Sequence, residues 1–269
     1  MLDRQYRRAA KSKSTFTRRE VLTRAVASAS AFALAGCDRL GKTAWFRNTL
    51  QTGESLSKSV HQLLGGRISM AQEFTLADLS PTFRGNGNTE PKSDEYQAHA
   101  KKEFVDWSLE VNGLVEQVTS FTLAQLKAMP PRTQITRHDC VEGWSAIGQW
   151  TGVPLAQVLA LVKPKPEARF VVFHCADSFE GDNGADIPYY ESIDMDDAYH
   201  PQTMLAYALN GNPLPVTNGA PVRLRVERQL GYKHAKYVMR LEVVESFADI
   251  KGGKGGYWED RGYQWYAGI

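Results

Sequence analysis

Cys140 is the residue whose type and neighbours indicate the clearest chemistry. It lies in the run Arg137-His138-Asp139-Cys140-Val141-Glu142-Gly143-Trp144, at the predicted end of a strand, where rigid scaffolds often display reactive groups. Two basic neighbours, Arg137 and His138, would favour the thiolate, and soft, redox-active metals prefer thiolate ligands. The residues alone leave three alternatives open: a buried inert cysteine, half of a disulfide, or a nucleophile with His174 or His234 as its base.

The other cysteines define two further alternatives. If Cys37 is lost or lipidated in an exported protein, only Cys140 and Cys175 remain in an oxidising compartment, and a non-catalytic binding module held by a Cys140–Cys175 disulfide would suit them. A zinc protein would use His138, Cys140, His174 and Cys175. Their spacings differ from those of ordinary structural zinc sites.

Two basic residues near the C-terminal end could bind an anion. Arg223 and Lys236 are cationic donors of the kind that a phosphate needs, and arginine can engage it in a bidentate fashion. The alternative is that Arg223 and Arg225 form one solvated strand face.

The elements that position these residues are short and mixed. Alternating patterns predict strands over residues 107–113, 133–139, 169–174, 222–226 and 237–243, and a strand end that passes into a capped helix over 119–126. Helical spacing predicts one or two helices within 45–70 and further helices over 154–162 and 203–209, whereas 79–91 is predicted to be a loop. Without regular βαβ spacing or repeats, this order favours an α+β domain over a doubly wound sheet.

The N-terminus is typical of an export signal. Thr17-Arg18-Arg19-Glu20-Val21-Leu22 precedes a small-residue run and resembles a twin-arginine signal, and Leu34-Ala35-Gly36-Cys37 resembles a lipobox. No apolar run is long enough to span a membrane. The leader carries eight basic and two acidic residues, so the formal charge of +2 becomes −4 for the remainder, which gives no support for a nucleic-acid partner.

Two long motifs resemble a known family. Cys140-Val141-Glu142-Gly143-Trp144-Ser145, followed by Trp150-Thr151-Gly152-Val153-Pro154-Leu155, is similar to the molybdenum-ligand segment of sulfite oxidase-like molybdopterin oxidoreductases, especially the bacterial periplasmic methionine sulfoxide reductase catalytic subunits. Asn218-Gly219-Ala220-Pro221-Val222-Arg223-Leu224, continuing to Gly231-Tyr232-Lys233-His234-Ala235-Lys236, resembles the family's pterin-binding segment. The resemblance implies an α+β, sulfite oxidase-type fold of mixed sheets with short helices.

It also implies a cofactor and its ligands. Molybdenum would be held by one pyranopterin and by the thiolate of Cys140, and the pterin and its phosphate by Asn218, Arg223, His234, Ala235 and Lys236. A loop that matches only through Asn-x-x-x-Glu adds Asn86, Thr89 and Glu90. Cys175 stands where the reductase has a threonine near the cofactor, and it could be a pterin contact, a core cysteine or a redox partner of Cys140.

The substrate side is less defined. Candidate groups are Asp177, Asp182, Tyr189, Tyr190 and Trp144, whereas Trp258, Tyr263 and Trp265 are expected to be mostly core and surface aromatics. Sulfite oxidases place several arginines around their anion, but residues 176–190 contain none and carry four acids, so an acidic loop is expected there. This favours a neutral substrate such as a sulfoxide, although Arg137 and Arg261 could fold inward.

The resemblance implies a two-electron oxygen-atom transfer enzyme, with a sulfite dehydrogenase catalytic subunit as the nearest alternative. No haem-attachment motif and no nicotinamide fingerprint occur, so a separate redox partner is expected, a membrane cytochrome b subunit or a soluble cytochrome c. The location would be the periplasm, with membrane contact only through that partner or a lipidated Cys37. We expect a signal over residues 1–36, a helical extension over 37–78, the cofactor domain over 79–251 and a packed Gly- and aromatic-rich segment over 252–269.

Overall fold

The protein is described from a computed structural model that covers residues 43–65, 69–181 and 184–269. The predicted export motif, Cys37 and Asp182 lie outside the described residues. The chain divides into two compact units, residues 1–56 and 57–269. One helix, α2 (Ala44–Gly65), accounts for the helical spacing predicted in this region, and no helix of the described residues is long and apolar enough to cross a membrane.

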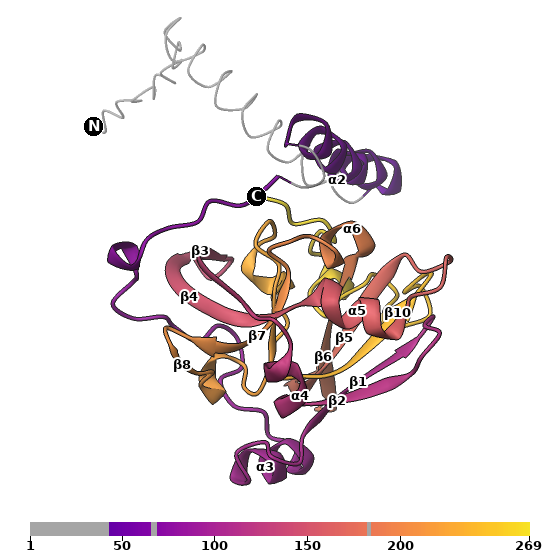
Figure 1. The fold of residues 1–269 in the computed structure, drawn as a ribbon. Helices are drawn as coiled ribbons and strands as arrows, with labels where there is room; N and C mark the ends of the chain where they lie inside the picture. The colour runs from indigo at the N-terminus through magenta and orange to yellow at the C-terminus, as the bar shows by residue number, and fades with distance from the viewer. Residues whose placement is uncertain (1–42, 66–68, 182–183) are drawn as a thin grey trace, which may run out of the picture. The chain divides into compact units, whose positions relative to one another are not determined.

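A mixed five-stranded sheet forms one layer of the larger unit (Figure 1). Its strand order is β2 (Thr119–Thr122), β1 (Ser108–Gly113), β10 (Val238–Val244), β5 (Phe170–Glu180) and β6 (Asp186–Asp194). The β1–β10 pair is parallel and the other pairs are antiparallel. The combination of parallel and antiparallel neighbours confirms the mixed sheet expected from the sequence.

The second sheet is antiparallel and carries Cys140. Its path is β3 (Arg132–Cys140), β4 (Trp144–Pro154), β7 (Met204–Leu209) and β8 (Asn212–Pro213), and β9 (Arg223–Arg225) pairs with β7. The β3–β4 pairing runs without a break from Arg132 opposite Gly152 to Cys140 opposite Trp144. This long hairpin fixes where Cys140 leaves the sheet.

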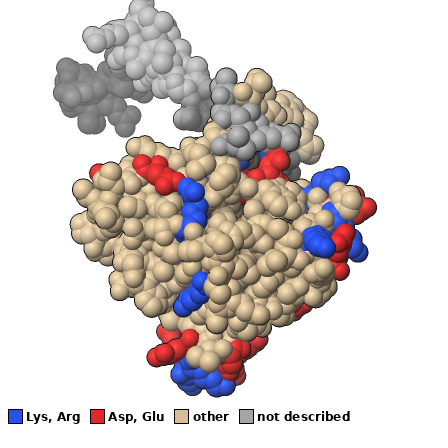
Figure 2. Space-filling view, viewed as in Figure 1, with Lys and Arg blue, Asp and Glu red and all other residues tan. Residues whose placement is uncertain are grey.

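Short helices connect the strands, as an α+β domain requires. The helix α4 (Leu123–Ala128) begins with a capping box, in which the hydroxyl of Thr122 accepts from the N–H of Gln125. Others are α3 (Asp94–Lys101), α5 (Leu155–Val162), α6 (Met195–Ala198) and the 3₁₀ turns η1 (Leu76–Asp78), η2 (Val216–Asn218), η3 (Gly231–Lys233) and η4 (Glu259–Arg261). Figure 2 shows Lys and Arg side chains beside Asp and Glu over α3, so the charges there are mixed in sign.

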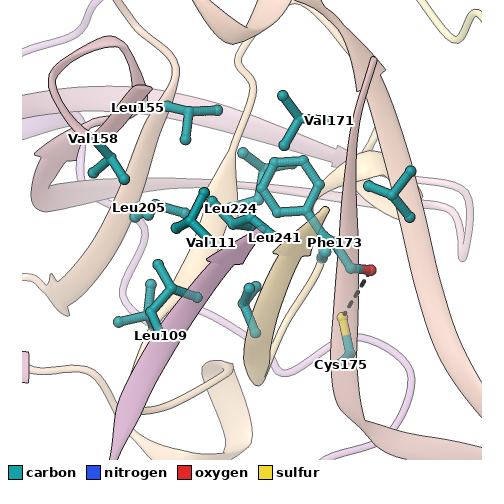
Figure 3. Close-up of a cluster of buried hydrophobic side chains, with 14 of the residues drawn as sticks. Leu109, Val111, Leu155, Val158, Val171, Phe173, Cys175, Leu205, Leu224 and Leu241 are labelled. Atoms are coloured by element: carbon teal, nitrogen blue, oxygen red, sulfur yellow. Dashed lines mark hydrogen bonds between the residues drawn. The ribbon is translucent and has the colours of Figure 1, made fainter. Parts of the chain in front are cut away.

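Side chains from both sheets share one hydrophobic core (Figure 3). Alternate residues of β1, Leu109 and Val111, point inward and are fully buried, as the period of a strand requires. The members labelled in Figure 3 are Leu109, Val111, Leu155, Val158, Val171, Phe173, Cys175, Leu205, Leu224 and Leu241. Because the two sheets share this core, loops that leave both of them are held at fixed positions.

The structure corrects two expectations about local structure. Residues 203–209, predicted as a helix, contain strand β7, which pairs with β4, β8 and β9. Periodicity cannot separate a buried strand from a buried helix over so short an apolar run. The acidic loop expected over 176–190 is mostly the two arms of the β5–β6 hairpin, paired as far as Glu180 and Asp186.

Candidate active site

Cys140 ends strand β3 at a tight turn. The N–H of Gly143 donates to the carbonyl of Cys140 at 3.1 Å, and Gly143 has a φ of +85°, which favours glycine. Val141, Glu142 and Gly143 are exposed, whereas Cys140 is half-buried. The thiol is therefore displayed at the end of a rigid hairpin, as the sequence predicted.

A cavity opens beside this turn, with about 750 Å³ of space between atoms including its open mouth. Five segments that are distant in sequence supply its walls. They are the loop with Asn86, Gly87 and Asn88, the turn with Cys140, Val141 and Glu142, the β5–β6 hairpin with Asp177, Phe179 and Tyr189, the η3 region with Tyr232, His234 and Lys236, and the C-terminal segment with Trp258 and Tyr263. Such a concave site, lined by aromatic and a few polar groups, is typical of a small-molecule site.

Arg223 is a buried cation without a carboxylate partner among the described residues. It is fully buried and donates to the carbonyls of Asn218 at 3.0 Å and His234 at 3.2 Å, and its Nε atom has no partner there. Burial and the nearby Arg225 lower the pKa of Arg223 to about 9. A buried charge normally needs a counter-charge. This arginine therefore fits an external anion, although it does not itself line the cavity.

Lys236 is the second such cation, and it lines the cavity. Its ammonium donates to the carbonyls of Asn88 and Thr217, the latter at 3.3 Å, and no ion pair joins it to a carboxylate in the described chain. Burial and the charge of Arg223 lower the pKa of Lys236 to about 7. Two adjacent cations held only by neutral groups match the phosphate of the expected pterin.

Arg225 shows that the alternative of a solvated strand face is wrong. Both arginines of β9 are fully buried, but Arg225 forms a two-pronged ion pair with Glu227 at 2.9 and 2.6 Å. A guanidinium and a carboxylate that match in this way satisfy each other. Arg223 thus remains the arginine of β9 that could hold an anion.

His234 offers a free acceptor to the cavity. Its Nε2 lies 3.0 Å from the carbonyl of Gln229, which can only accept, so Nε2 carries the proton and Nδ1 is bare. Nδ1 is buried and has no partner among the described residues. Burial and Arg225 hold the pKa of His234 well below its usual range. A neutral acceptor of this kind suits the N–H groups of a pterin.

The charges beside Cys140 differ from those expected. The guanidinium of Arg137 turns to Asp139 at 3.0 Å, and burial holds the pKa of His138 well below its usual range, so His138 is neutral. Burial raises the pKa of the Cys140 thiol, and Arg223 lowers it. The expectation that Arg137 and His138 favour the thiolate is therefore wrong, because one points away and the other is uncharged.

The structure brings only part of the predicted Asn86–Glu90 set to the cavity. Asn86 lines it, and its Oδ1 is buried without a partner in the described residues. Thr89 and Glu90 are exposed and lie outside the lining, and Glu90 accepts from the amide of Gln97. Asn88, which the motif comparison missed, binds Ser178 through its amide at 2.6 Å and Lys236 through its carbonyl.

Asn218, Ala235 and Cys175 are buried away from the lining. The carbonyl of Asn218 accepts from Arg223, and the carbonyl of Ala235 accepts from the N–H of Leu224 at 2.8 Å. Cys175 lies in the hydrophobic core beside Phe173 (Figure 3), and burial raises the pKa of its thiol well above the usual range. Asn218 and Ala235 position the β9–η3 region, while Cys175 contributes to packing.

Of the predicted substrate groups, Asp177 and Tyr189 reach the cavity. Tyr190 donates to Asp260 at 2.7 Å, and Trp144 donates to Glu142 at 2.9 Å. Arg137 and Arg261 do not line the cavity, and Arg261 lies over the ring of Tyr257.

Trp258 and Tyr263, which were expected to be mostly core and surface aromatics, line the cavity. Their rings stack with centroids 5.3 Å apart. The aromatic-rich composition of residues 252–269 was the only available signal.

Both cysteines of the described chain are free, so the Cys140–Cys175 disulfide is not formed. No group of three or more His, Cys, Asp or Glu side chains within residues 43–65, 69–181 and 184–269 could hold a metal ion, which argues against the zinc alternative.

Comparison with known proteins agrees with this geometry. Residues 96–249, more than half of the chain, match the family model described as the oxidoreductase molybdopterin binding domain. A putative protein-methionine-sulfoxide reductase subunit, YedZ1, of Azospira oryzae is 47% identical over 160 residues, which are 60% of this chain and 55% of that protein. The protein-methionine-sulfoxide reductase catalytic subunit MsrP of Xanthomonas campestris is 37% identical over 164 residues, 59% of this chain and 51% of that protein.

The chain spans about half the length of these curated relatives. Among solved structures, the sulfane dehydrogenase SoxCD of Paracoccus pantotrophus matches with a TM-score of 0.46 and 27% identity over 53% of this chain and 39% of that one. The family match confirms the resemblance carried by the two motifs. The chain belongs to the oxidoreductases with a molybdopterin-binding domain, and it is an enzyme whose cofactor is molybdenum bound to a pterin.

Proposed function

We propose that this protein is an exported reductase that removes the oxygen atom from small sulfoxides of the methionine sulfoxide type. The observation that carries the proposal is the cavity beside Cys140, whose lining combines the cation Lys236 with several aromatic side chains. The names of the relatives support the same substrate class.

Each cavity residue has a defined task in this proposal. Cys140 ligates the metal, and a ligating thiol is deprotonated by the ion itself. Arg223 and Lys236 hold the phosphate, and the bare acceptors of His234 and Asn86 bind N–H groups of the pterin. When bound, the cofactor supplies exchange of an oxygen atom and two electrons, while the protein orients the substrate.

The lining favours a neutral substrate over sulfite. No arginine lines the cavity among the described residues, and Glu142 and Asp177 do. A sulfite dianion would meet the carboxylate of Glu142, whereas a sulfoxide carries no net charge. Phe179, Tyr189, Trp258 and Tyr263 add aromatic rings to the lining, and thioether sulfur makes favourable contacts with such rings.

The proposal includes the route to the site. The twin-arginine pattern within residues 1–36 would export the folded, loaded protein to the periplasm, and Cys37 would be its site of lipidation if the lipobox is used. Electrons would arrive from a separate partner, a membrane cytochrome b subunit or a soluble cytochrome c. The relatives' names, which describe subunits, support a partner of some kind.

The test uses full-length protein matured in a host that makes the cofactor. We expect molybdenum at a ratio near one per chain and reduction of methionine sulfoxide with an artificial electron donor, and we expect Cys140→Ala to abolish the activity. The matched control is Cys175→Ser, which should keep the activity because Cys175 lies in the core. Oxidation of sulfite with no reduction of sulfoxides would instead identify a sulfite dehydrogenase subunit, and absence of molybdenum would overturn the proposal.

A further inference from the structure

Sulfoxide reduction needs protons inside the cavity, and this inference rests on the proposed function. The S–O bond breaks, sulfur is reduced by two electrons that the reduced cofactor supplies, and the oxygen takes up two protons to leave as water. Transfer of a proton in the transition state by a positioned side chain commonly accelerates such a reaction. A donor of this kind must line the cavity and must hold a proton that no other group already accepts.

Hydrogen bonds exclude most of the polar lining. Both carboxylate oxygens of Glu142 already accept, from the N–H of Gly87 at 2.9 Å and from Trp144 at 2.9 Å. His234 turns its N–H to Gln229 and presents a bare nitrogen, and Tyr189 donates to the carbonyl of Tyr232 at 2.6 Å. Lys236 donates to two backbone carbonyls, and the proposed function assigns it to the phosphate.

Asp177 differs from these groups because one of its carboxyl oxygens has no hydrogen-bond partner in the described part of the chain. Its residue lies on β5 where the register with β6 shifts, lines the cavity and is only 3% exposed. Its Oδ1 is buried and has no hydrogen-bond partner among the described residues. A buried carboxyl with a free oxygen is poised to hold a proton, since an unpaired buried carboxylate is costly.

Among the described residues, Lys236 is the charged group that acts on Asp177. The phenols of Tyr96, Tyr189 and Tyr237 face it from α3, β6 and the η3 region, and burial raises their pKa values, so they are neutral. The thiol of Cys175 is neutral for the same reason. Lys236 supplies the positive charge, and the Asn88 amide also favours the carboxylate; burial outweighs both and raises the pKa of Asp177 to about 7.

We propose that Asp177 is the proton donor of the reaction. Its carboxyl O–H gives one proton to the oxygen that leaves the sulfur, the second proton comes from solvent, and the carboxylate is then reprotonated through the mouth of the cavity. A carboxylic acid held protonated by its apolar surroundings commonly has this role in enzymes.

The first measurement does not depend on turnover. Infrared difference spectra of the purified full-length protein across pH 5–9 should show the carbonyl band of a buried protonated carboxyl that titrates near pH 7. Asp177→Asn should remove the band. Asp186→Asn, a change of an exposed carboxylate on the same hairpin, should leave it. A wild-type protein without this band would overturn the proposal.

The second measurement is the rate of sulfoxide reduction against pH, at matched molybdenum content. Wild-type kcat should fall above about pH 7 as the carboxyl loses its proton, and Asp177→Asn should lower kcat by about 10²-fold or more and flatten that fall. Asp177→Glu should recover part of the rate. Retention of the wild-type pH profile and of over half the rate by Asp177→Asn would refute the proton-donor role.

The outcomes separate this inference from the proposed function. If Asp177→Asn loses its molybdenum, the infrared band and Asp177→Glu decide the question. If the wild-type protein shows the titrating band but reduces no sulfoxide, the proposed function is wrong, while Asp177 is still a buried protonated carboxyl. If the protein reduces sulfoxides but lacks the band, the proposed function is supported and Asp177 is not the proton donor.

Discussion

Arg223 and Arg225 leave the same face of strand β9 and lie over the same indole ring, that of Trp150, at 5.1 and 4.4 Å from its centroid. Arg225 is neutralised within the protein by Glu227, whereas Arg223 is satisfied only by backbone carbonyls. Two identical side chains two residues apart thus have different tasks, one in the fold and one in the site.

This difference predicts opposite effects of two matched substitutions. Arg225→Met should lower the free energy of unfolding of the metal-free protein by about 3–5 kcal/mol, because it leaves the buried carboxylate of Glu227 unpaired. Arg223→Met removes an unpaired buried charge, so it should cost much less stability but abolish cofactor retention. Chemical denaturation and molybdenum analysis of both variants would check this. Equal losses of stability would contradict the assignment.

The pKa of Lys236 predicts how the stability of the metal-free protein depends on pH. Its value is about 7 in the folded protein against 10.5 ordinarily, so the unfolded chain binds more protons between these limits. The free energy of unfolding should therefore rise with pH over that window, by up to about 1.4 kcal/mol for each pKa unit.

Two changes should remove the contribution of Lys236 to the pH dependence of stability: substitution of Lys236 and binding of the cofactor. Lys236→Met cannot titrate, and a bound phosphate would restore the pKa of Lys236 by supplying the missing counter-charge. Denaturation curves at pH 7, 8 and 9 for wild-type, variant and loaded protein would show the effect. A variant whose stability rises with pH as steeply as the wild type would refute it.

Lys233 connects the C-terminal segment to the fold. Its fully buried ammonium binds Glu259 at 2.7 Å and also Glu191 on β6. Lys233→Met leaves two carboxylates buried together and should destabilise the protein by about 3–5 kcal/mol. Glu259→Gln keeps one complete ion pair and should cost less.

Loosening of the C-terminal segment can be measured directly. Trypsin should cleave at Lys251 and Lys254 faster in Glu259→Gln than in the wild type, while cleavage at Lys101, on the distant helix α3, serves as the internal reference. Unchanged relative cleavage rates would mean that Glu259 does not hold this segment.

The stacked pair Trp258 and Tyr263 predicts an effect on substrate and not on cofactor. Trp258→Ala should lower kcat/KM for methionine sulfoxide by about 10- to 100-fold, since it removes apolar contact worth roughly 1–3 kcal/mol, at unchanged molybdenum content. The control is Tyr199→Ala, which removes an exposed ring that does not line the cavity. If both variants retain wild-type kcat/KM, the aromatic wall does not contact the substrate.

Local sequence patterns were sufficient to predict some elements of this fold. The alternation before Cys140 predicted strand β3, and the hairpin displays the thiol as expected. The long Cys140 motif and the block that ends at Lys236 predicted the ligand and the anion site, and the structure places Cys140 and Lys236 in one cavity. The helix predicted over residues 203–209 was wrong. This segment is strand β7, whose conformation depends on its pairing with β4 and β9.

The remaining errors concern contacts between distant segments. Arg137 was expected to act on Cys140, but three residues along a strand reverse the face, so Arg137 lies on the face of Asp139 and pairs with it. Asn88 and Trp258 reach the cavity from segments on opposite sides of the motif region in sequence. Asn88 lies two residues from Asn86, but the motif comparison selected only Asn86, Thr89 and Glu90 in that loop, and Trp258 lies outside both motifs.

The wall formed by Trp258 and Tyr263 also bears on when the enzyme can be assembled. The ribosome makes Tyr263 more than a hundred residues after Cys140, a delay on the order of ten seconds at bacterial elongation rates. Until then the cavity has its metal-binding thiol but lacks one side. A cofactor that arrived early would meet an open groove, so the stable loaded state forms only after translation has passed the C-terminal segment.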